Sequence, residues 1–156
     1  CGPRGVVHDY VPFYFCKRSR MLLRVVNGKN VDQEELIYFV LPIDMVERRN
    51  AVFTDASANT ATPPHFFCGG ERLDELTWDD IDSQDWNLGD TNAERRRMAE
   101  LLVRDAVDLT DVTEIIVWDD SVAAEVARQF RAAKKRCPGT FVDDRHYHYY
   151  DKWFAG

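Results

Sequence analysis

The sequence predicts an α+β domain of short strands and few helices, without regular βαβ alternation. Three observations support this class. The clearest strand pattern, at 36–41 (LIYFVL), is a short β-branched and aromatic run that a proline ends. A second buried run, at 113–118 (TEIIVW), leads into a helix pattern. The 156 residues, 45% of them apolar, suit one domain over 1–156 with a substantial core.

The first strand is expected in the stretch YVPFYFC (10–16), where apolar side chains alternate along the chain. Three cations follow it closely: Lys17, Arg18 and Arg20. A strand that opens from the core onto cations suits a phosphate or carboxylate site, because arginine presents a planar fork of donors to such anions. The alternative is a strand that leaves the core into a solvated loop.

Residues 21–26 are expected to form a short helix that Asn27-Gly28 ends. The strand at 36–41 and a shorter one at 51–54 are interpreted as neighbours in an antiparallel sheet. A long loop is expected over 55–70, and long loops in compact domains are often functional.

The acidic stretch 73–86 is expected to be irregular and anchored in the core by Trp78, Ile81 and Trp86. A helix should start at Asp90-Thr91, with Glu94 completing a capping box from Thr91.

The residues after that helix start, AELLVRDAV (99–107), are ambiguous. As a strand from about 101 to 104, they would put Glu100 at the rim of the core, where a lone carboxylate can stabilise a cationic sugar transition state or align a ribose hydroxyl. As a continued helix, they would leave Glu100 exposed and paired with Arg96 or Arg104 at i, i+4.

Beyond the strand at 113–118, Asp120 and Ser121 are expected to cap a helix that runs to about Lys135. An edge strand at 141–142 and a packed aromatic tail at 146–154 complete the predicted fold.

The formal net charge of −7 argues against a general nucleic-acid coat, although clustered arginines and lysines allow a local basic groove. The four cysteines lie far apart without a CxxC pair, so we expect free thiols in a reducing cytoplasm and no metal site. No run of about 18 apolar residues predicts a membrane span. Because the chain starts at Cys1 and enters a strand almost at once, we expect an N-terminal segment, which can include part of a site, to be missing.

Two stretches resemble one known family. YVPFYFCKRSRML (10–22) resembles the YVPFYF-x-x-RSPML stretch of the DarT-type DNA ADP-ribosyltransferase toxins, and RRRMAELLV (95–103) resembles their RR-Q-AE-F-LV stretch. VFTDASA (52–58) is similar to the family's FTD segment, and Trp153-Phe154 to its closing aromatic pair. Order and approximate spacing agree over almost the whole chain.

The resemblance implies an ADP-ribosyltransferase-like fold, with two small antiparallel sheets around an NAD cleft. It implies transfer of ADP-ribose from NAD⁺ to a base of single-stranded DNA, with thymine as the expected base. It also implies a toxin that is cytoplasmic, monomeric and paired with a macrodomain antitoxin.

Residue by residue, the resemblance gives catalytic roles to Arg18 and Glu100. We expect Arg18, Ser19 and Tyr14 to contact NAD, with two roles open for Arg18: binding the pyrophosphate or polarising the acceptor base. The three consecutive arginines Arg95, Arg96 and Arg97 are expected to steer the DNA backbone.

The chain departs from the family pattern at three places. Arg20 replaces a proline, Ala56-Ser57 replaces Gly-His, and Met98 replaces a glutamine. These departures keep two alternatives open: a degenerate, non-catalytic nucleic-acid or nucleotide-binding domain, and the same fold acting on guanine or on a protein.

Overall fold

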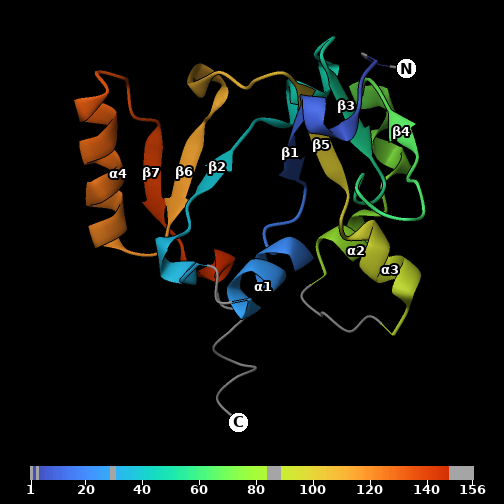
Figure 1. Ribbon diagram of the computed structural model, residues 1–156, viewed down its shortest axis with the longest axis horizontal. Helices are drawn as coiled ribbons and strands as arrows, with labels where there is room; N and C mark the ends of the chain where they lie inside the picture. The colour runs from blue at the N-terminus through green and yellow to red at the C-terminus, as the bar shows by residue number, and fades with distance from the viewer. Residues whose placement is uncertain (1, 3, 29–30, 84–88, 148–156) are drawn as a thin grey trace. The chain divides into compact units, whose positions relative to one another are not determined.

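The computed structural model describes residues 2, 4–28, 31–83 and 89–147 (Figure 1). The chain forms two compact units. Unit 1 comprises Cys1–Ser19 and Ile43–Val107, and unit 2 comprises Arg20–Pro42 and Asp108–Gly156. Each unit is built around its own small sheet, and the α+β class predicted from the sequence is confirmed.

Unit 1 holds a four-stranded antiparallel sheet with the order β1-β5-β3-β4. Its strands are β1 (Tyr10–Tyr14), β3 (Ala51–Thr54), β4 (Phe66–Phe67) and β5 (Glu100–Arg104). The ambiguous stretch after the arginines is therefore a strand. Its continuous apolar run suits a central strand, and its burial shows that it occupies one.

The antiparallel pairing of 36–41 with 51–54 is wrong. β3 uses both of its hydrogen-bonding edges, one for β5 and one for β4, so it has none left for an earlier strand. The predicted loop 55–70 also contains a short element, because β4 forms within it and makes the sheet edge.

Short helices complete unit 1: α2 (Trp78–Ile81) and α3 (Thr91–Arg96). The N-cap of α3 is Asp90, whose side chain accepts a hydrogen bond from the Asn92 N–H (2.8 Å). Ile81 is buried as expected. Trp78, expected to be a core anchor, is instead exposed (36%), although its ring makes an edge contact with Phe15 (ring centroids 5.7 Å apart). Trp86 lies outside the described residues.

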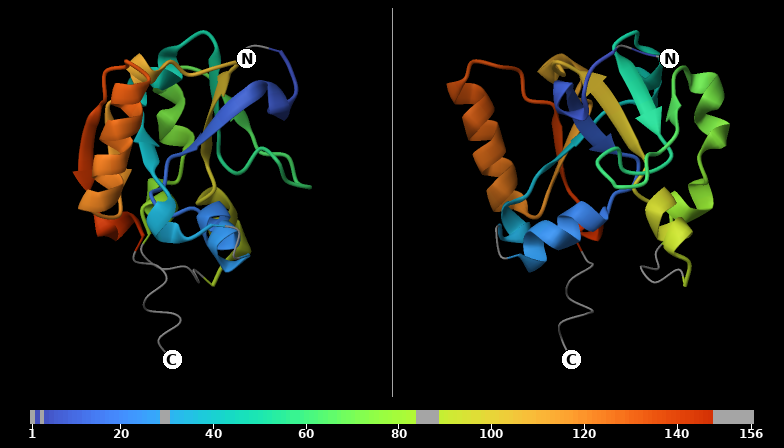
Figure 2. Two further views of the ribbon diagram at one scale, coloured as in Figure 1. Left: turned by 60° about the vertical axis from the view of Figure 1, so that its left-hand side comes forward. Right: turned by 45° about the vertical axis from the view of Figure 1, so that its right-hand side comes forward.

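Unit 2 contains α1 (Arg20–Asn27) and a three-stranded sheet with the order β2-β6-β7. The strands are β2 (Tyr38–Val40), β6 (Glu114–Val117) and β7 (Gly139–Val142). β2 and β6 are antiparallel, but β6 and β7 are parallel, and α4 (Asp120–Ala132) connects them (Figure 2). One βαβ crossover thus departs from the purely antiparallel sheets that the resemblance implied.

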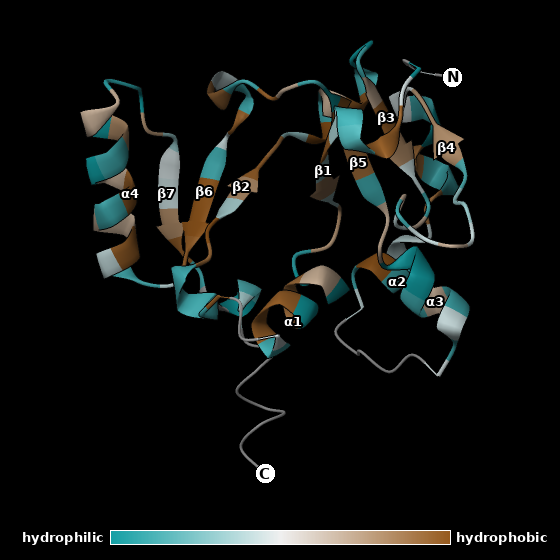
Figure 3. Cartoon of the chain, viewed as in Figure 1, coloured by the Kyte–Doolittle hydropathy of each residue, from teal (hydrophilic) through white to brown (hydrophobic). Residues whose placement is uncertain are grey.

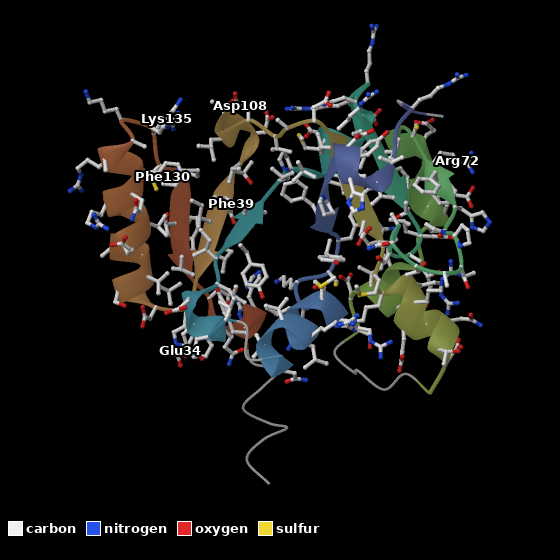
Figure 4. The ribbon with its side chains drawn as sticks, in the orientation of Figure 1. Glu34, Phe39, Arg72, Asp108, Phe130 and Lys135 are labelled. Carbon is white, nitrogen blue, oxygen red and sulfur yellow. The ribbon has the colours of Figure 1, made fainter. Side chains whose placement is uncertain are left out.

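The core of unit 2 forms between β6 and α4. Ile115 and Val117 pack with Val126 of α4, and Phe130 projects from α4 onto the same cluster (Figure 4). Hydrophilic residues occupy much of the rest of the α4 surface (Figure 3), as expected for a helix with one apolar stripe. The helix is capped by Asp119, one residue before the predicted cap.

Cys68 is disulfide-bonded, contrary to the expectation that every cysteine is a free thiol. Cys16 and Cys137 are free, and Cys16 is buried. Within 2, 4–28, 31–83 and 89–147, no helix is long and apolar enough to cross a membrane. The same residues contain no cluster of three potential metal ligands.

Candidate active site

A row of four cross-strand neighbours crosses one end of the sheet of unit 1. Their Cα atoms pair strand by strand in the order Tyr14, Glu100, Thr54, Phe66. Cross-strand neighbours project from the same face of a sheet. The adjacent row projects from the other face and is apolar throughout: Phe13, Leu101, Phe53, Phe67. A register shift of one residue would exchange the two faces, so the apolar row fixes where Glu100 points.

The Glu100 side chain is buried, with only 5% of its surface exposed. Its Oε2 accepts a hydrogen bond from the Ala58 N–H (3.0 Å), and its carboxylate also accepts one from the Tyr14 hydroxyl. A buried carboxylate is costly unless it is hydrogen-bonded, and these two donors supply that stabilisation. They also fix the direction in which the carboxylate points.

Thr54 holds the loop that covers this carboxylate. Its hydroxyl donates to the carbonyl of Ala56 (2.6 Å) and accepts from the Glu100 N–H (3.3 Å). Thr54 is fully buried. Sequence reasoning did not select this residue, although its place inside the FTD segment, directly before the loop, was an available signal.

Burial raises the pKa of the Tyr14 hydroxyl strongly, and the nearby Glu100 carboxylate raises it further. The phenol therefore stays protonated and keeps donating to Glu100 at any physiological pH. This assembly can bind ribose hydroxyl groups or stabilise positive charge at a neighbouring sugar carbon.

The chain that leaves β1 stays close to the residues before β5. The Phe15 N–H donates to the carbonyl of Ala99 (3.3 Å), next to Glu100. Arg18, which is half-buried, and Ser19, which is buried, follow in the same unit. The fold thus places Tyr14 in contact with Glu100, and Arg18 follows Tyr14 by four positions in the sequence.

The three consecutive arginines have different environments. Arg95 donates to the carbonyls of Thr62 (2.9 Å) and Pro63 (3.0 Å). Arg96 pairs with Asp80 (2.5 Å) and is partly exposed. Arg97 is buried and donates to the carbonyl of Ser83. It lies near the Cys16 thiol: burial raises the pKa of this thiol, and the positive charge of Arg97 offsets part of that rise. Contact with DNA stays a prediction for all three, and only Arg95 and Arg96 have access to solvent that a direct contact requires.

Asp55 and His65 form a pair that sequence reasoning also did not select. The Asp55 carboxylate binds the His65 N–H (2.9 Å) and its Nδ1 (2.7 Å), closing the loop between β3 and β4. The His65 ring is 6.3 Å from that of Phe67, on the apolar side of the sheet. The pair therefore shapes the loop from the face opposite Glu100.

Comparison with known proteins identifies the family. The family described as "ssDNA thymidine ADP-ribosyltransferase, DarT" matches residues 1–154. The chain belongs to the DarT family.

Two curated relatives, both named DNA ADP-ribosyl transferase, come from Thermus species. The relative from Thermus aquaticus (strain ATCC BAA-2747 / Y51MC23) is 36% identical over 80% of this chain and 56% of its own length. The one from Thermus sp. (strain 2.9) is 33% identical over 85% of this chain and 66% of its own length. The chain thus spans less than two thirds of the length of these relatives.

Two solved structures of Thermus sp. 2.9 DarT share the fold, each with a TM-score of 0.84 and 30% identity. One is a complex with NAD⁺; the match covers 92% of this chain and 75% of that one. The other is a complex with ADP-ribosylated single-stranded DNA; the match covers 92% of this chain and 71% of that one.

Proposed function

We propose that this DarT-family chain transfers ADP-ribose from NAD⁺ to a base of single-stranded DNA, with thymine as the acceptor. The observation that carries this proposal is the Glu100 carboxylate, buried at the end of a central strand and oriented by Tyr14 and the Ala58 N–H. A single carboxylate held in this way suits chemistry in which positive charge develops on a sugar.

In the proposed reaction, the bond between nicotinamide and the ribose anomeric carbon breaks, and nicotinamide leaves as a neutral molecule with the bonding electrons. The oxocarbenium-like sugar is stabilised by Glu100. A ring nitrogen of the base then bonds to the anomeric carbon and loses its proton to solvent or to a nearby base. Atoms and charge balance without any further reactant.

We assign Arg18 and Ser19 to the pyrophosphate of NAD⁺, and Tyr14 to orienting Glu100 beside the ribose. A guanidinium is suited to oxygen anions because it donates two parallel hydrogen bonds. Arg18 follows the strand that carries Tyr14, the cross-strand neighbour of Glu100.

For the DNA strand we assign Arg95 and Arg96, which belong to α3 and are both partly exposed. Arg97, being buried, would act by supporting the turn that leads into β5. The proposed physiological role is that of a monomeric bacterial toxin in the cytoplasm, where DNA is accessible, countered by a macrodomain antitoxin.

The decisive experiment incubates the purified protein with NAD⁺ and single-stranded oligonucleotides that differ only in containing or lacking thymine. We expect an ADP-ribose mass increase on the thymine-containing strand and free nicotinamide in equal amount. Fragmentation of the product locates the modified base, so addition to guanine would overturn the thymine assignment alone.

One alternative remains testable in the same assay. Met98 and Ser57 replace polar residues of the family pattern close to Glu100, which favours a domain that binds nucleic acid without reacting. Salt-sensitive binding of the oligonucleotide by folded protein, with no product, would support that alternative and overturn the transferase proposal.

A further inference from the structure

The row that contains Glu100 ends in an exposed aromatic ring. Phe66 lies opposite Thr54, which in turn lies opposite Glu100, so all three side chains leave the same face of the sheet. Thr54 and Glu100 are buried, whereas Phe66 is 47% exposed. Its neighbour Phe67 faces the other way and packs against Phe53, with ring centroids 5.3 Å apart.

This arrangement gives the row two different ends. Arg18 and Ser19, which are assigned to NAD⁺, follow β1 in the chain, and Phe66 lies on β4, at the opposite edge of the sheet from β1. Neighbouring strands are about 4.8 Å apart, so the backbone positions of Glu100 and Phe66 are separated by roughly 10 Å. That separation is within reach of a nucleotide adjacent to the one that reacts at Glu100.

The segment before Phe66 is restrained by hydrogen bonds and by prolines. Arg95 of α3 donates two hydrogen bonds to the carbonyls of Thr62 and Pro63, and two consecutive prolines, Pro63 and Pro64, restrict the backbone. A ring on such a support loses little conformational freedom when it binds a ligand. The same contact brings a guanidinium to the segment that carries Phe66, and nucleic-acid sites combine cations with stacking rings in this way.

We propose that Phe66 is a stacking platform for a base of the single-stranded DNA next to the acceptor base. The proposal rests on the proposed function, since it names a contact for the substrate of that site. An aromatic face binds any base, so the ring would hold the strand in place without selecting its sequence. The adenine of NAD⁺ offers the same chemistry, but Arg18 and Ser19, which are assigned to NAD⁺, follow the strand at the opposite end of the row.

The test compares Phe66→Leu, which keeps apolar volume but removes the π face, with Phe66→Trp, which keeps a π face. Phe141→Leu is the matched control, because Phe141 is similarly exposed (51%) and lies on β7 of unit 2. Each protein is titrated without NAD⁺ against an oligonucleotide with intact bases and against versions with one abasic position beside the acceptor. Transfer rates are then measured against DNA and against NAD⁺ concentration.

We expect Phe66→Leu to weaken binding of the intact oligonucleotide at least about fivefold, the lower limit for one aromatic–base stack. One abasic position should weaken wild-type binding by a similar factor and should have no further effect on Phe66→Leu. Phe66→Trp should restore binding, and Phe141→Leu should behave as wild type. The KM for NAD⁺ should not change in any variant.

The proposal that Phe66 stacks a base would be overturned if Phe66→Leu bound DNA as tightly as wild type. It would also be overturned if the abasic position weakened binding equally in wild type and in Phe66→Leu. A rise in the KM for NAD⁺ with unchanged DNA binding would show that the ring stacks adenine instead. Failure of the proposed function is a separate result, seen when wild-type protein makes no product with any oligonucleotide, because the binding measurements do not depend on the reaction.

Discussion

The sheets of the two units bury different kinds of side chain. In unit 1 a central strand begins with a buried carboxylate, and a threonine hydroxyl and a tyrosine surround it. In unit 2 the central strand β6 also begins with a glutamate, Glu114, but that side chain is exposed and the strand then buries only apolar residues. Because a buried polar group is costly unless it is paired, the glutamate in unit 1 needs a reason to be there, and the one in unit 2 does not.

Changing Glu100 to glutamine should have the largest effect on activity. The substitution keeps the shape of the side chain but removes its negative charge, so transfer of ADP-ribose should fall by about two to three orders of magnitude. Glu114→Gln on β6 is the matched control and should retain full activity. The measurement is single-turnover transfer to an oligonucleotide, with circular dichroism to confirm folding. A Glu100→Gln rate within tenfold of wild type would contradict the role of this carboxylate.

Truncating a core side chain of unit 2 should lower stability and leave the transfer rate almost unchanged. Ile115 is completely buried beside α4, so Ile115→Ala should lower the free energy of unfolding by about 2–5 kcal/mol through lost contacts and a cavity. Denaturant titration measures this change. At temperatures where the variant stays folded, its transfer rate should differ from wild type by less than about twofold. If folded Ile115→Ala lost as much activity as Glu100→Gln, the inference that the chemistry depends on unit 1 and not on the core of unit 2 would be wrong.

Tyr14→Phe tests whether the hydroxyl of Tyr14 orients Glu100 in unit 1. A hydrogen bond to a charged group contributes about 1.5–3 kcal/mol, so removing the hydroxyl that orients Glu100 should lower kcat about tenfold or more. The KM for DNA should stay unchanged, which separates orientation of the carboxylate from binding of the strand. Tyr38→Phe, which removes a hydroxyl bonded to the His146 carbonyl (3.3 Å) in unit 2, is the control. Equal kcat values for both variants would remove Tyr14 from the mechanism.

The smallest effect concerns acid stability in unit 2. Hydrogen bonds from Arg145 lower the pKa of Asp143 to about 2. A depressed carboxyl pKa stabilises the fold above the unfolded value near 4, and this contribution is lost as pH falls from about 4 to 2. Asp143→Asn should therefore be slightly less stable than wild type at pH 6 and show a shallower loss of stability on acidification. Parallel pH curves in denaturant titrations would contradict this assignment.

The motif stretches explain how the strands that carry the candidate site could be predicted. The alternating pattern at 10–14 and the apolar run after Glu100 predicted two strands, because strand position and burial both follow from local hydrophobicity. The contact between Tyr14 and Glu100 could not be predicted from the sequence, because the two residues are paired only through the register of β1 and β5. For the same reason the pairing of β2 with β3 was predicted wrongly, since proximity in sequence does not decide which strand edges are occupied.

The sequence by itself determined the family, the α+β class, and the residue types available for chemistry, because these follow from composition, periodicity and motif order. Tertiary structure alone decided which charges are buried and which strands are neighbours. It separated Arg97 from Arg95 and Arg96, and it placed Thr54 and Phe66 in line with Glu100. The physical reason is that burial and hydrogen-bond partners arise from contacts between distant parts of the chain, which no local pattern encodes.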